Sequence, residues 1–141
     1  MLYMLLGQNL PFLELVALTL AYFIAIVIAF SAHEFSHAFV AYKAGDSTSR
    51  AQGRMSLNPF NHIDPIGMLC FLFIGFGWAK PVQVNPLHFR HYKRDMFFVS
   101  IAGVLTNLIL AFVFSGIYFF TIPYLFQATN AFLVFLSYKC G

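Results

Sequence analysis

The chain has 141 residues, enough for one compact domain and too few for two. Hydrophobic residues make up 60% of it and charged residues 9%, whereas about a quarter of a typical soluble protein is charged. So few charges cannot cover a water-exposed globule, and the composition predicts a protein solvated largely by the lipid bilayer. The net charge of +3 does not indicate nucleic acid, because the basic residues lie in short loops between apolar runs, as in the inner loops of membrane proteins.

Four hydrophobic segments follow one another along the chain. The first extends from Leu10 to Phe30 and continues to about Tyr42, which is long enough to cross a membrane at about 20 residues per span and to project beyond it. Gly45 is a suitable end for this helix, because glycine readily adopts the left-handed conformation that closes helices. The second segment, Ile66–Trp78, is short for a span and contains three glycines, so it suits a re-entrant helix as well as a crossing one.

The other two hydrophobic segments, Met96–Phe120 and Ile122–Tyr138, are expected to be separate helices, with Pro123 in the first turn of the later one. Two short stretches, Gly53–Asn58 and Pro81–Asn85, alternate like strands, and the prolines that bracket the second favour an edge strand. The predicted fold is an all-α polytopic membrane protein with three to four transmembrane or re-entrant helices and short edge strands near the active site, in a single domain covering residues 1–141.

The eight lysines and arginines predict the orientation of the chain. If the second segment is re-entrant, all eight lie on one side of the membrane, which the positive-inside rule makes the cytoplasmic side. If that segment crosses, the four later loop cations, Lys80, Arg90, Lys93 and Arg94, lie outside. We favour the re-entrant arrangement, which predicts a multi-pass protein of the cell membrane with its active site toward the cytoplasm.

The stretch His33-Glu34-Phe35-Ser36-His37 carries the predicted chemistry. On a helix, residues i and i+4 lie on one face, so the two imidazoles can bind one metal ion while Glu34 lies beside them as a base for a water molecule. The same pattern arises by chance in soluble helices as a polar patch. Here it ends a strongly apolar helix, in which an unpaired ionisable group is costly. We therefore predict that His33 and His37 bind Zn2+.

A catalytic zinc site also needs a third protein ligand. The local candidates are His62, Asp64, His88, His91 and Asp95. None has a spacing that singles it out. Asp64 precedes a proline and is expected to cap a turn, while His88 and His91 flank an arginine and are expected to be solvated.

Four motifs in order along the chain resemble the site-2 protease family of intramembrane zinc metalloproteases, in its compact bacterial form without a PDZ domain. They are SAHEFSHAFVAYKAGD, GRMSLNPFNHIDPIG, FGWAKPVQVNP and IAGVLTNLILA. The resemblance covers residues 28–110, over half of the chain. It implies that His33 and His37 are zinc ligands, that Glu34 is the catalytic base, and that membrane helices pack around a site reached by water from the cytoplasm.

The chain departs from the family pattern in two places. Val104 and Thr106 replace a proline and a serine in the family's Ala-Gly-Pro-Leu-Ser-Asn, while Asn107 is kept and is in place to hydrogen-bond near the site, although simple helix packing explains it equally well. The family's third ligand, an aspartate in a later Leu-Asp-Gly motif, has no counterpart before Gly141. A truncated chain, a local substitute ligand or an inactive protein would each account for this, and we favour truncation.

The predicted function is hydrolysis of peptide bonds in a membrane protein or peptide substrate, with Glu34 activating a water at the zinc. A helix hides its own carbonyls, so the substrate has to unwind. Val82 and Val84, on one face of Pro81–Asn85, are predicted to bind it as an added strand, and Asn107 is a further candidate for substrate binding. The alternative is a catalytically inactive zinc-binding membrane scaffold or binding protein, which the missing third ligand motivates.

Overall fold

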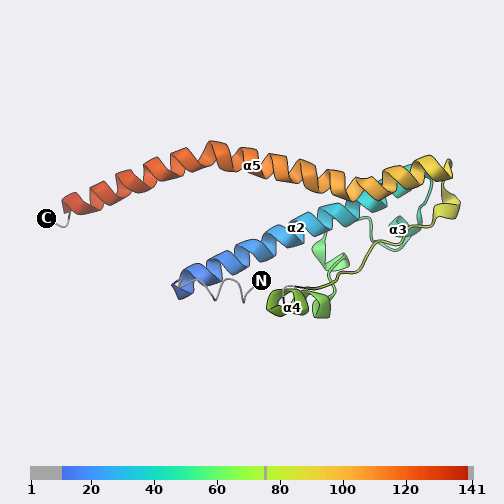
Figure 1. Ribbon diagram of the computed structural model, residues 1–141, viewed down its shortest axis with the longest axis horizontal. Coiled ribbons are helices and arrows are strands. Elements are labelled where there is room, and N and C mark those ends of the chain that lie inside the picture. The colour runs from blue at the N-terminus through green and yellow to red at the C-terminus, as the bar shows by residue number, and fades with distance from the viewer. Residues whose placement is uncertain (1–10, 75, 140–141) are drawn as a thin grey trace. The chain divides into compact units, whose positions relative to one another are not determined.

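The structure is a computed structural model that describes residues 11–74 and 76–139, and most of these are helical (Figure 1). In chain order the elements are α2 (Phe12–Ala44), α3 (Thr48–Ala51), the 3-10 turn η1 (Pro59–Asn61), α4 (Pro65–Ile74), the 3-10 turn η2 (Pro86–His88) and α5 (Tyr92–Lys139). The chain divides into two compact units, Met1–Asn107 and Leu108–Gly141. The prediction of a mostly helical protein is confirmed.

Helix α2 is the predicted first segment, and it ends where the sequence indicates. No proline or glycine interrupts its 33 residues, which extend over about 50 Å at the usual rise per residue. Gly45 ends the helix with φ at 115°, its N–H donating to the Tyr42 carbonyl at 3.1 Å while the Asp46 N–H donates to the Ala41 carbonyl at 2.9 Å. These are the two hydrogen bonds of a Schellman ending, which needs a left-handed residue. The predicted start at Leu10 lies outside the described residues.

Among the described residues, two helices are long and apolar enough to cross a membrane, namely α2 and the Tyr92–Gln127 part of α5. Little of either apolar stretch is buried within the protein. Large side chains on both are exposed, including Leu20 at 55% and Phe112 at 72%. A helix that is apolar all round and not covered by protein suits lipid, and not the core of a soluble domain.

Helix α4 begins at a capping residue that the sequence indicates. Asp64 accepts hydrogen bonds from the N–H groups of Ile66 (3.0 Å) and Gly67 (3.1 Å), which confirms its expected capping role. The ten residues of α4 extend over about 15 Å, half of the roughly 30 Å of a bilayer core. The helix ends at Ile74, so the predicted segment reached too far. Residues 76–78 are irregular, and a Cβ at Gly67 would lie 2.0 Å from the Trp78 carbonyl oxygen, which shows how closely the returning chain packs against α4.

The prediction of short edge strands is wrong for both segments, since neither forms a strand in the described part of the chain. Residues 53–58 form turns and bends, because the Arg54 N–H donates back to Ser49 and the Asn58 side chain caps η1. Residues 81–85 are irregular, and their backbone groups bond to side chains instead of to a neighbouring strand, as the site below shows. Alternation of apolar residues favours a strand only where a partner supplies the ladder of hydrogen bonds.

The predicted boundary between the third and fourth segments is also absent. Helix α5 runs without interruption from Tyr92 to Lys139, and Pro123 lies inside it instead of near its start. The Thr121 hydroxyl donates to the carbonyl of Ile117 at 2.7 Å within the same stretch. Proline is tolerated inside apolar helices of membrane proteins, where breaking the helix would leave more backbone groups unsatisfied than proline does.

Candidate metal centre

Small residues bring α2 and α5 close together at the level of the histidines. The buried hydrophobic residues of the described chain are Ala38 and Ala41 on α2 and Val99 and Ala102 on α5. The Ser36 and Thr106 hydroxyls meet at 2.6 Å from the two helices. Small and hydroxyl side chains at a helix contact permit close backbone approach, as in membrane proteins. This contact sets where the imidazoles of α2 lie against α5.

Gly103 provides the space for the first imidazole. A Cβ at this position would lie 2.4 to 2.6 Å from three ring atoms of His33, among them Nε2. Ordinary carbon contacts are about 3.5–4.0 Å. Glycine is therefore required here by the close approach of the ring, because any side chain would displace His33.

The two predicted zinc ligands face each other. The Nε2 atoms of His33 and His37 are 3.0 Å apart, and the rings meet edge to face with centroids 4.7 Å apart. The other nitrogen of His37, Nδ1, lies 2.6 Å from the Val99 carbonyl oxygen, which can accept a hydrogen bond but cannot donate one. Nδ1–H therefore donates to Val99, and the Nε2 of neutral His37 presents a lone pair to His33.

Asn107 holds the second nitrogen of His33. Its amide lies 3.2 Å from His33 Nδ1, and its Oδ1 has no hydrogen-bond partner among the described residues. Turning the amide by half a rotation presents Oδ1 to a His33 Nδ1–H and leaves the His33 Nε2 lone pair free. Metal-binding histidines commonly donate their other N–H to a carbonyl or carboxylate in this way. Two lone pairs at 3.0 Å repel unless a cation lies between them.

The pair fits zinc as two members of a ligand set. Zinc–nitrogen bonds of about 2.0–2.1 Å at a tetrahedral angle place two nitrogens about 3.3 Å apart, close to the 3.0 Å found here. Among the described residues, no third His, Cys, Asp or Glu joins them in a group that could hold a metal ion. The structure therefore provides two nitrogen donors and leaves the third ligand unassigned.

The five local candidates for a third ligand have other partners or lie elsewhere. Asp64 caps α4, His88 donates to Asp46, and the Asp95 carboxylate accepts from the His91 N–H at 2.8 Å and from Arg94 at 3.0 Å. His62 is fully buried, with Nε2 2.7 Å from the Ser56 carbonyl and Nδ1 without a partner among the described residues. None of the five is brought to the histidine pair.

Glu34 is buried beside the pair and points toward the loop before η2. Only 7% of its surface is exposed, and Oε2 accepts a hydrogen bond from the Val82 N–H at 2.8 Å. A pocket of about 310 Å3 opens at this point, lined by nine residues from α2, the loop and α5: Glu34, His37, Pro81, Val82, Val84, Pro86, Met96, Val99 and Ser100. The structure thus brings Val82 and Val84 together with Glu34 and His37, while Asn107 lies behind His33 and does not line this pocket.

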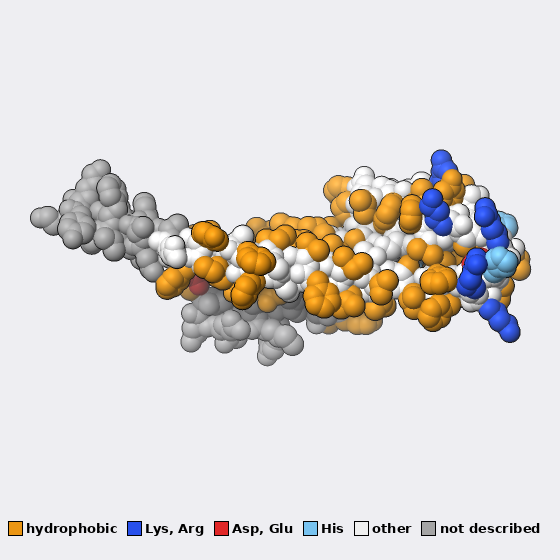
Figure 2. All heavy atoms as spheres, turned by 90° about the horizontal axis from the view of Figure 1, so that it is seen from above, with side chains coloured by type: hydrophobic (Ala, Val, Ile, Leu, Met, Phe, Trp, Pro, Cys, Tyr) orange, Lys and Arg blue, Asp and Glu red, His pale blue; other side chains and the backbone are white. Residues whose placement is uncertain are grey.

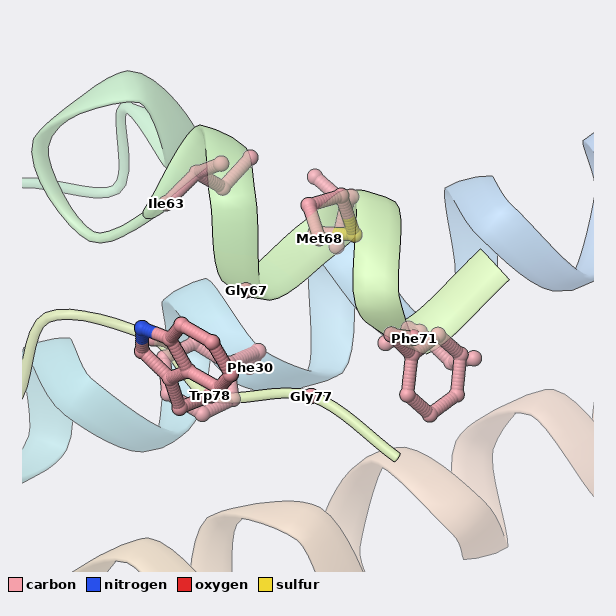
Figure 3. Close-up of a pocket in the computed structure, with 10 residues that line it drawn as sticks. Phe30, Ile63, Gly67, Met68, Phe71, Gly77 and Trp78 are labelled. Atoms are coloured by element: carbon pink, nitrogen blue, oxygen red, sulfur yellow. The ribbon is translucent and has the colours of Figure 1, made fainter. Parts of the chain in front are cut away.

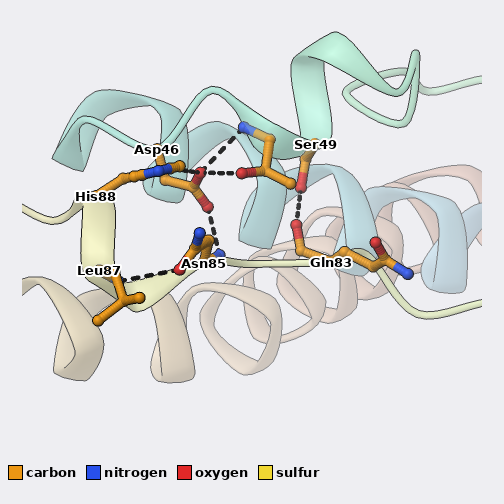
Figure 4. Close-up of polar contacts among 7 residues, drawn as sticks. Asp46, Ser49, Gln83, Asn85, Leu87 and His88 are labelled. Carbon is orange, nitrogen blue, oxygen red and sulfur yellow. Dashed lines mark hydrogen bonds and ion pairs between the residues drawn. The ribbon is translucent and has the colours of Figure 1, made fainter.

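Asp46 anchors the loop that carries Val82 (Figure 4). It is fully buried, and its carboxylate accepts hydrogen bonds from the Thr48 N–H at 3.0 Å, the Asn85 N–H at 2.7 Å and His88 Nδ1 at 3.1 Å. The Ser49 hydroxyl, next along the chain, donates to the Gln83 carbonyl. Burial alone would raise the pKa of Asp46, but the hydrogen bonds from Thr48, Asn85 and His88 outweigh it and hold that pKa below its ordinary value.

Sequence reasoning missed Asp46, although a local signal was present. The residue follows the helix-ending glycine in Lys43-Ala44-Gly45-Asp46 and precedes Ser47-Thr48, and an aspartate two residues before a threonine N–H forms an Asx turn. What the sequence does not show is the long-range partner, because Asn85 is 39 residues away along the chain. Asp46 fixes the end of α2 to the loop that reaches Glu34.

An apolar cavity of about 190 Å3 lies one helical turn from His33 (Figure 3). Its walls come from α2, α4 and the returning chain, and Figure 3 shows Phe30, Met68, Phe71 and Trp78 around it. The Phe30 ring also stacks on His33 with centroids 6.5 Å apart. Phe30 therefore links the wall of this cavity to the first imidazole of the pair.

The fold and the site together define a helical chain in which two apolar helices meet at a His-Glu-His group, with the 81–85 loop beside it. Curated proteins similar to this chain carry a name that suits such a group. "Putative zinc metalloprotease YwhC" of Bacillus subtilis (strain 168) is 49% identical over 90 residues, which are 64% of this chain and 41% of that protein.

"Putative zinc metalloprotease Rip2" of Mycobacterium tuberculosis (strain H37Rv) is 31% identical over 120 residues, covering 79% of this chain and 46% of that protein. The Rip2 protein of Mycolicibacterium smegmatis is 31% identical over 90 residues, covering 60% of this chain and 34% of that protein. The chain thus spans less than half the length of these relatives. No family model and no solved structure matches it. The shared names support a zinc metalloprotease in general terms.

Proposed function

We propose that this chain forms the zinc-binding and substrate-binding part of an intramembrane metalloprotease of the site-2 protease type. The observation that carries the proposal is the pair of Nε2 atoms 3.0 Å apart, with His37 Nδ1 fixed on a backbone carbonyl and a buried carboxylate on the adjacent residue. Their position near the end of an exposed apolar helix supports hydrolysis at the membrane, and the names of the relatives support a metalloprotease.

In this proposal His33 and His37 hold the ion, and Val99 and Asn107 keep their rings oriented. When bound, zinc supplies Lewis acidity, which makes water nucleophilic near neutral pH and polarises a carbonyl. Glu34 accepts the proton of the attacking water and returns it to the leaving amine. The Val82 N–H, 2.8 Å from Oε2, fixes one carboxylate oxygen and leaves the other to take the proton.

The pocket beside Glu34 is the proposed place for the substrate backbone. Val82 and Val84 line it from the loop, Met96 and Val99 line it from α5, and the chain at 81–85 has no strand partner of its own. An unwound substrate segment adds beside 81–85, which brings a scissile carbonyl toward Glu34 and His37. The bracketing prolines keep the loop from pairing along its whole length, so substrate pairing stays local.

The proposed location is the cell membrane, with the basic loops and the active site on the cytoplasmic side. Lys43 lies in the last turn of α2, and Arg50 and Arg54 follow that helix. Lys80 and Arg90 precede α5, and Lys93 and Arg94 lie in its first turn, so basic residues surround the adjoining ends of both apolar helices. Helix α4, too short to cross, stays on that side as a re-entrant element. A membrane protein or peptide is the proposed substrate.

Replacing Glu34 by Gln tests the proposal. Glutamine keeps the shape and an oxygen that accepts from Val82, but it cannot take a proton, so we expect zinc to remain bound and cleavage of a membrane reporter to fall by about 10²–10⁴-fold. The measurements are metal content and reporter cleavage of the purified chain. Glu14→Gln, on an exposed part of the same helix, is the matched control and should leave both unchanged. Unaltered cleavage in Glu34→Gln would refute Glu34 as the base.

A second candidate function is a zinc-binding membrane scaffold without peptidase activity. It is favoured by the absence of a third ligand beside the histidine pair in the described part of the chain. Zinc bound stoichiometrically with no turnover in the unmodified chain would support the scaffold. Turnover that is lost on chelation and restored by zinc would exclude it.

A further inference from the structure

A basic groove lies at the junction of α2 and α5, outside the candidate metal centre. It has a volume of about 510 Å3 and is lined by seven residues: Val40, Lys43, Ala44, Arg90, Arg94, Asp95 and Phe98. Figure 2 shows lysine and arginine side chains gathered at this end of the first unit. Three cations against one acid give the groove a positive field in a concave site, which concentrates anions.

The one acid of the groove does not neutralise it. Asp95 is buried, and its carboxylate accepts from the backbone of His91 and from the Arg94 Nε at 3.0 Å. Arg94 still exposes 61% of its side chain. Lys43 lies with Nζ 5.6 Å from the Phe39 ring centroid and has no carboxylate partner, and Arg90 is exposed without an ion pair among the described residues. Lys43 and Arg90 are therefore left to bind an anion, and the exposed part of Arg94 can contribute as well.

The groove has an apolar side as well as a basic one. Val40 lies one turn before Lys43 toward the apolar part of α2, and Phe98 lies one turn after Arg94 toward the apolar part of α5. Beyond these two residues, both helices continue as long apolar stretches that suit lipid. A free anion would use only the cations, whereas an amphiphile with a phosphate head would use both sides.

We propose that this groove binds the phosphate head of an anionic phospholipid, with its acyl chains along Val40 and Phe98. The shared chemistry is a phosphate ester, and the apolar wall selects the lipid over free phosphate. A bound head joins the C-terminal end of α2 to the start of α5. These are the two helices whose contact places His33 against Gly103, so the lipid stabilises the fold that carries the site.

Thermal unfolding in a non-ionic detergent tests the proposal without reference to proteolysis, so a failure of the proposed protease function would leave the result readable. Soluble dihexanoyl phosphatidylglycerol should raise the melting temperature of the purified chain in a saturable way. Dihexanoyl phosphatidylcholine, of the same chain length without net charge, should not. Inorganic phosphate at the same concentration should not either, and an equal shift with it would overturn the lipid as the ligand.

The variant Lys43→Gln/Arg90→Gln removes both unpaired cations and leaves the Arg94–Asp95 pair in place. We expect the apparent affinity for the anionic lipid to fall by about fivefold for each cation, about 25-fold in all. The matched control Lys80→Gln/Lys93→Gln makes the same change of charge on exposed residues that do not line the groove, and should keep the wild-type affinity. Equal losses in the two variants would overturn the groove in favour of net charge alone.

Discussion

The substitution Gly103→Ala tests the geometry of the histidine pair most directly. The added Cβ would lie 2.4 Å from His33 Nε2 and 2.5 Å from Cε1, whereas such contacts are normally about 3.5 Å or more. Either the imidazole or the backbone of α5 has to move by roughly 1 Å. Bond lengths at a metal site tolerate about 0.2 Å, so a shift of this size removes His33 from a shared ion.

The magnitudes make zinc affinity a better measurement than stability. Overpacking costs about 1–3 kcal/mol, but alanine in place of a helical glycine returns about 1 kcal/mol, so the free energy of unfolding should fall by only about 0–2 kcal/mol. Loss of a correctly placed ligand should weaken zinc binding by at least 10–100-fold, as is found when groups that merely orient a ligand are removed. Competition with a chromophoric chelator, in detergent, measures this affinity.

Gly116→Ala is the matched control, since it makes the same change in the same helix at a position where nothing lies within 4 Å of the new Cβ. It should leave zinc affinity unchanged and raise stability by up to about 1 kcal/mol. Wild-type zinc affinity in Gly103→Ala would refute the reasoning, because it would mean that the His33 ring does not bind zinc from its place against α5.

Two further predictions concern residues that orient the site. Asn107→Ala should weaken zinc binding about tenfold by releasing His33 Nδ1, and Asn107→Asp, whose carboxylate can accept that N–H, should restore it; a pure packing role predicts no difference between the two variants. Because the pKa of Asp46 is lower in the folded chain than in the unfolded one, its contribution to stability is present above about pH 4 and is lost as the pH falls through the folded pKa. Denaturation measured from pH 7 to pH 3 should therefore show a smaller acid loss in Asp46→Asn than in wild type, and parallel curves would contradict this.

The sequence allowed the first helix and its chemistry to be predicted because both depend on local rules. The spacing of His33 and His37 puts them on one face of any helix, and Gly45 ends the helix through its own φ angle. The capping role of Asp64 is likewise a matter of neighbouring backbone groups. The roles of His33, His37 and Glu34 in zinc chemistry stay predictions, and the structure adds that the two Nε2 atoms converge.

The failures of sequence reasoning concern features that depend on distant partners. Val82 and Val84 alternate as in a strand, yet the backbone beside them bonds to Glu34 and Asp46 from α2 and its end. Pro123 led us to predict a helix boundary, but a helix ends only where the chain changes direction. No neighbouring residue forces such a change here, and the helix continues through the proline. The role of Asp46 was missed for the same reason, since its most informative partner is Asn85, far along the chain.

The anchoring of the 81–85 loop by Asp46 means that the two halves of the site can be separated by design. The imidazole pair is encoded by one turn of α2 and by the glycine that faces it, whereas the partner of Glu34 is positioned from beyond the helix end. Transplanting only the two helix faces into another scaffold would carry over the proposed zinc ligands and leave behind the loop that orients the carboxylate. A graft intended to cleave peptides would also have to bring the buried aspartate and the loop that it holds.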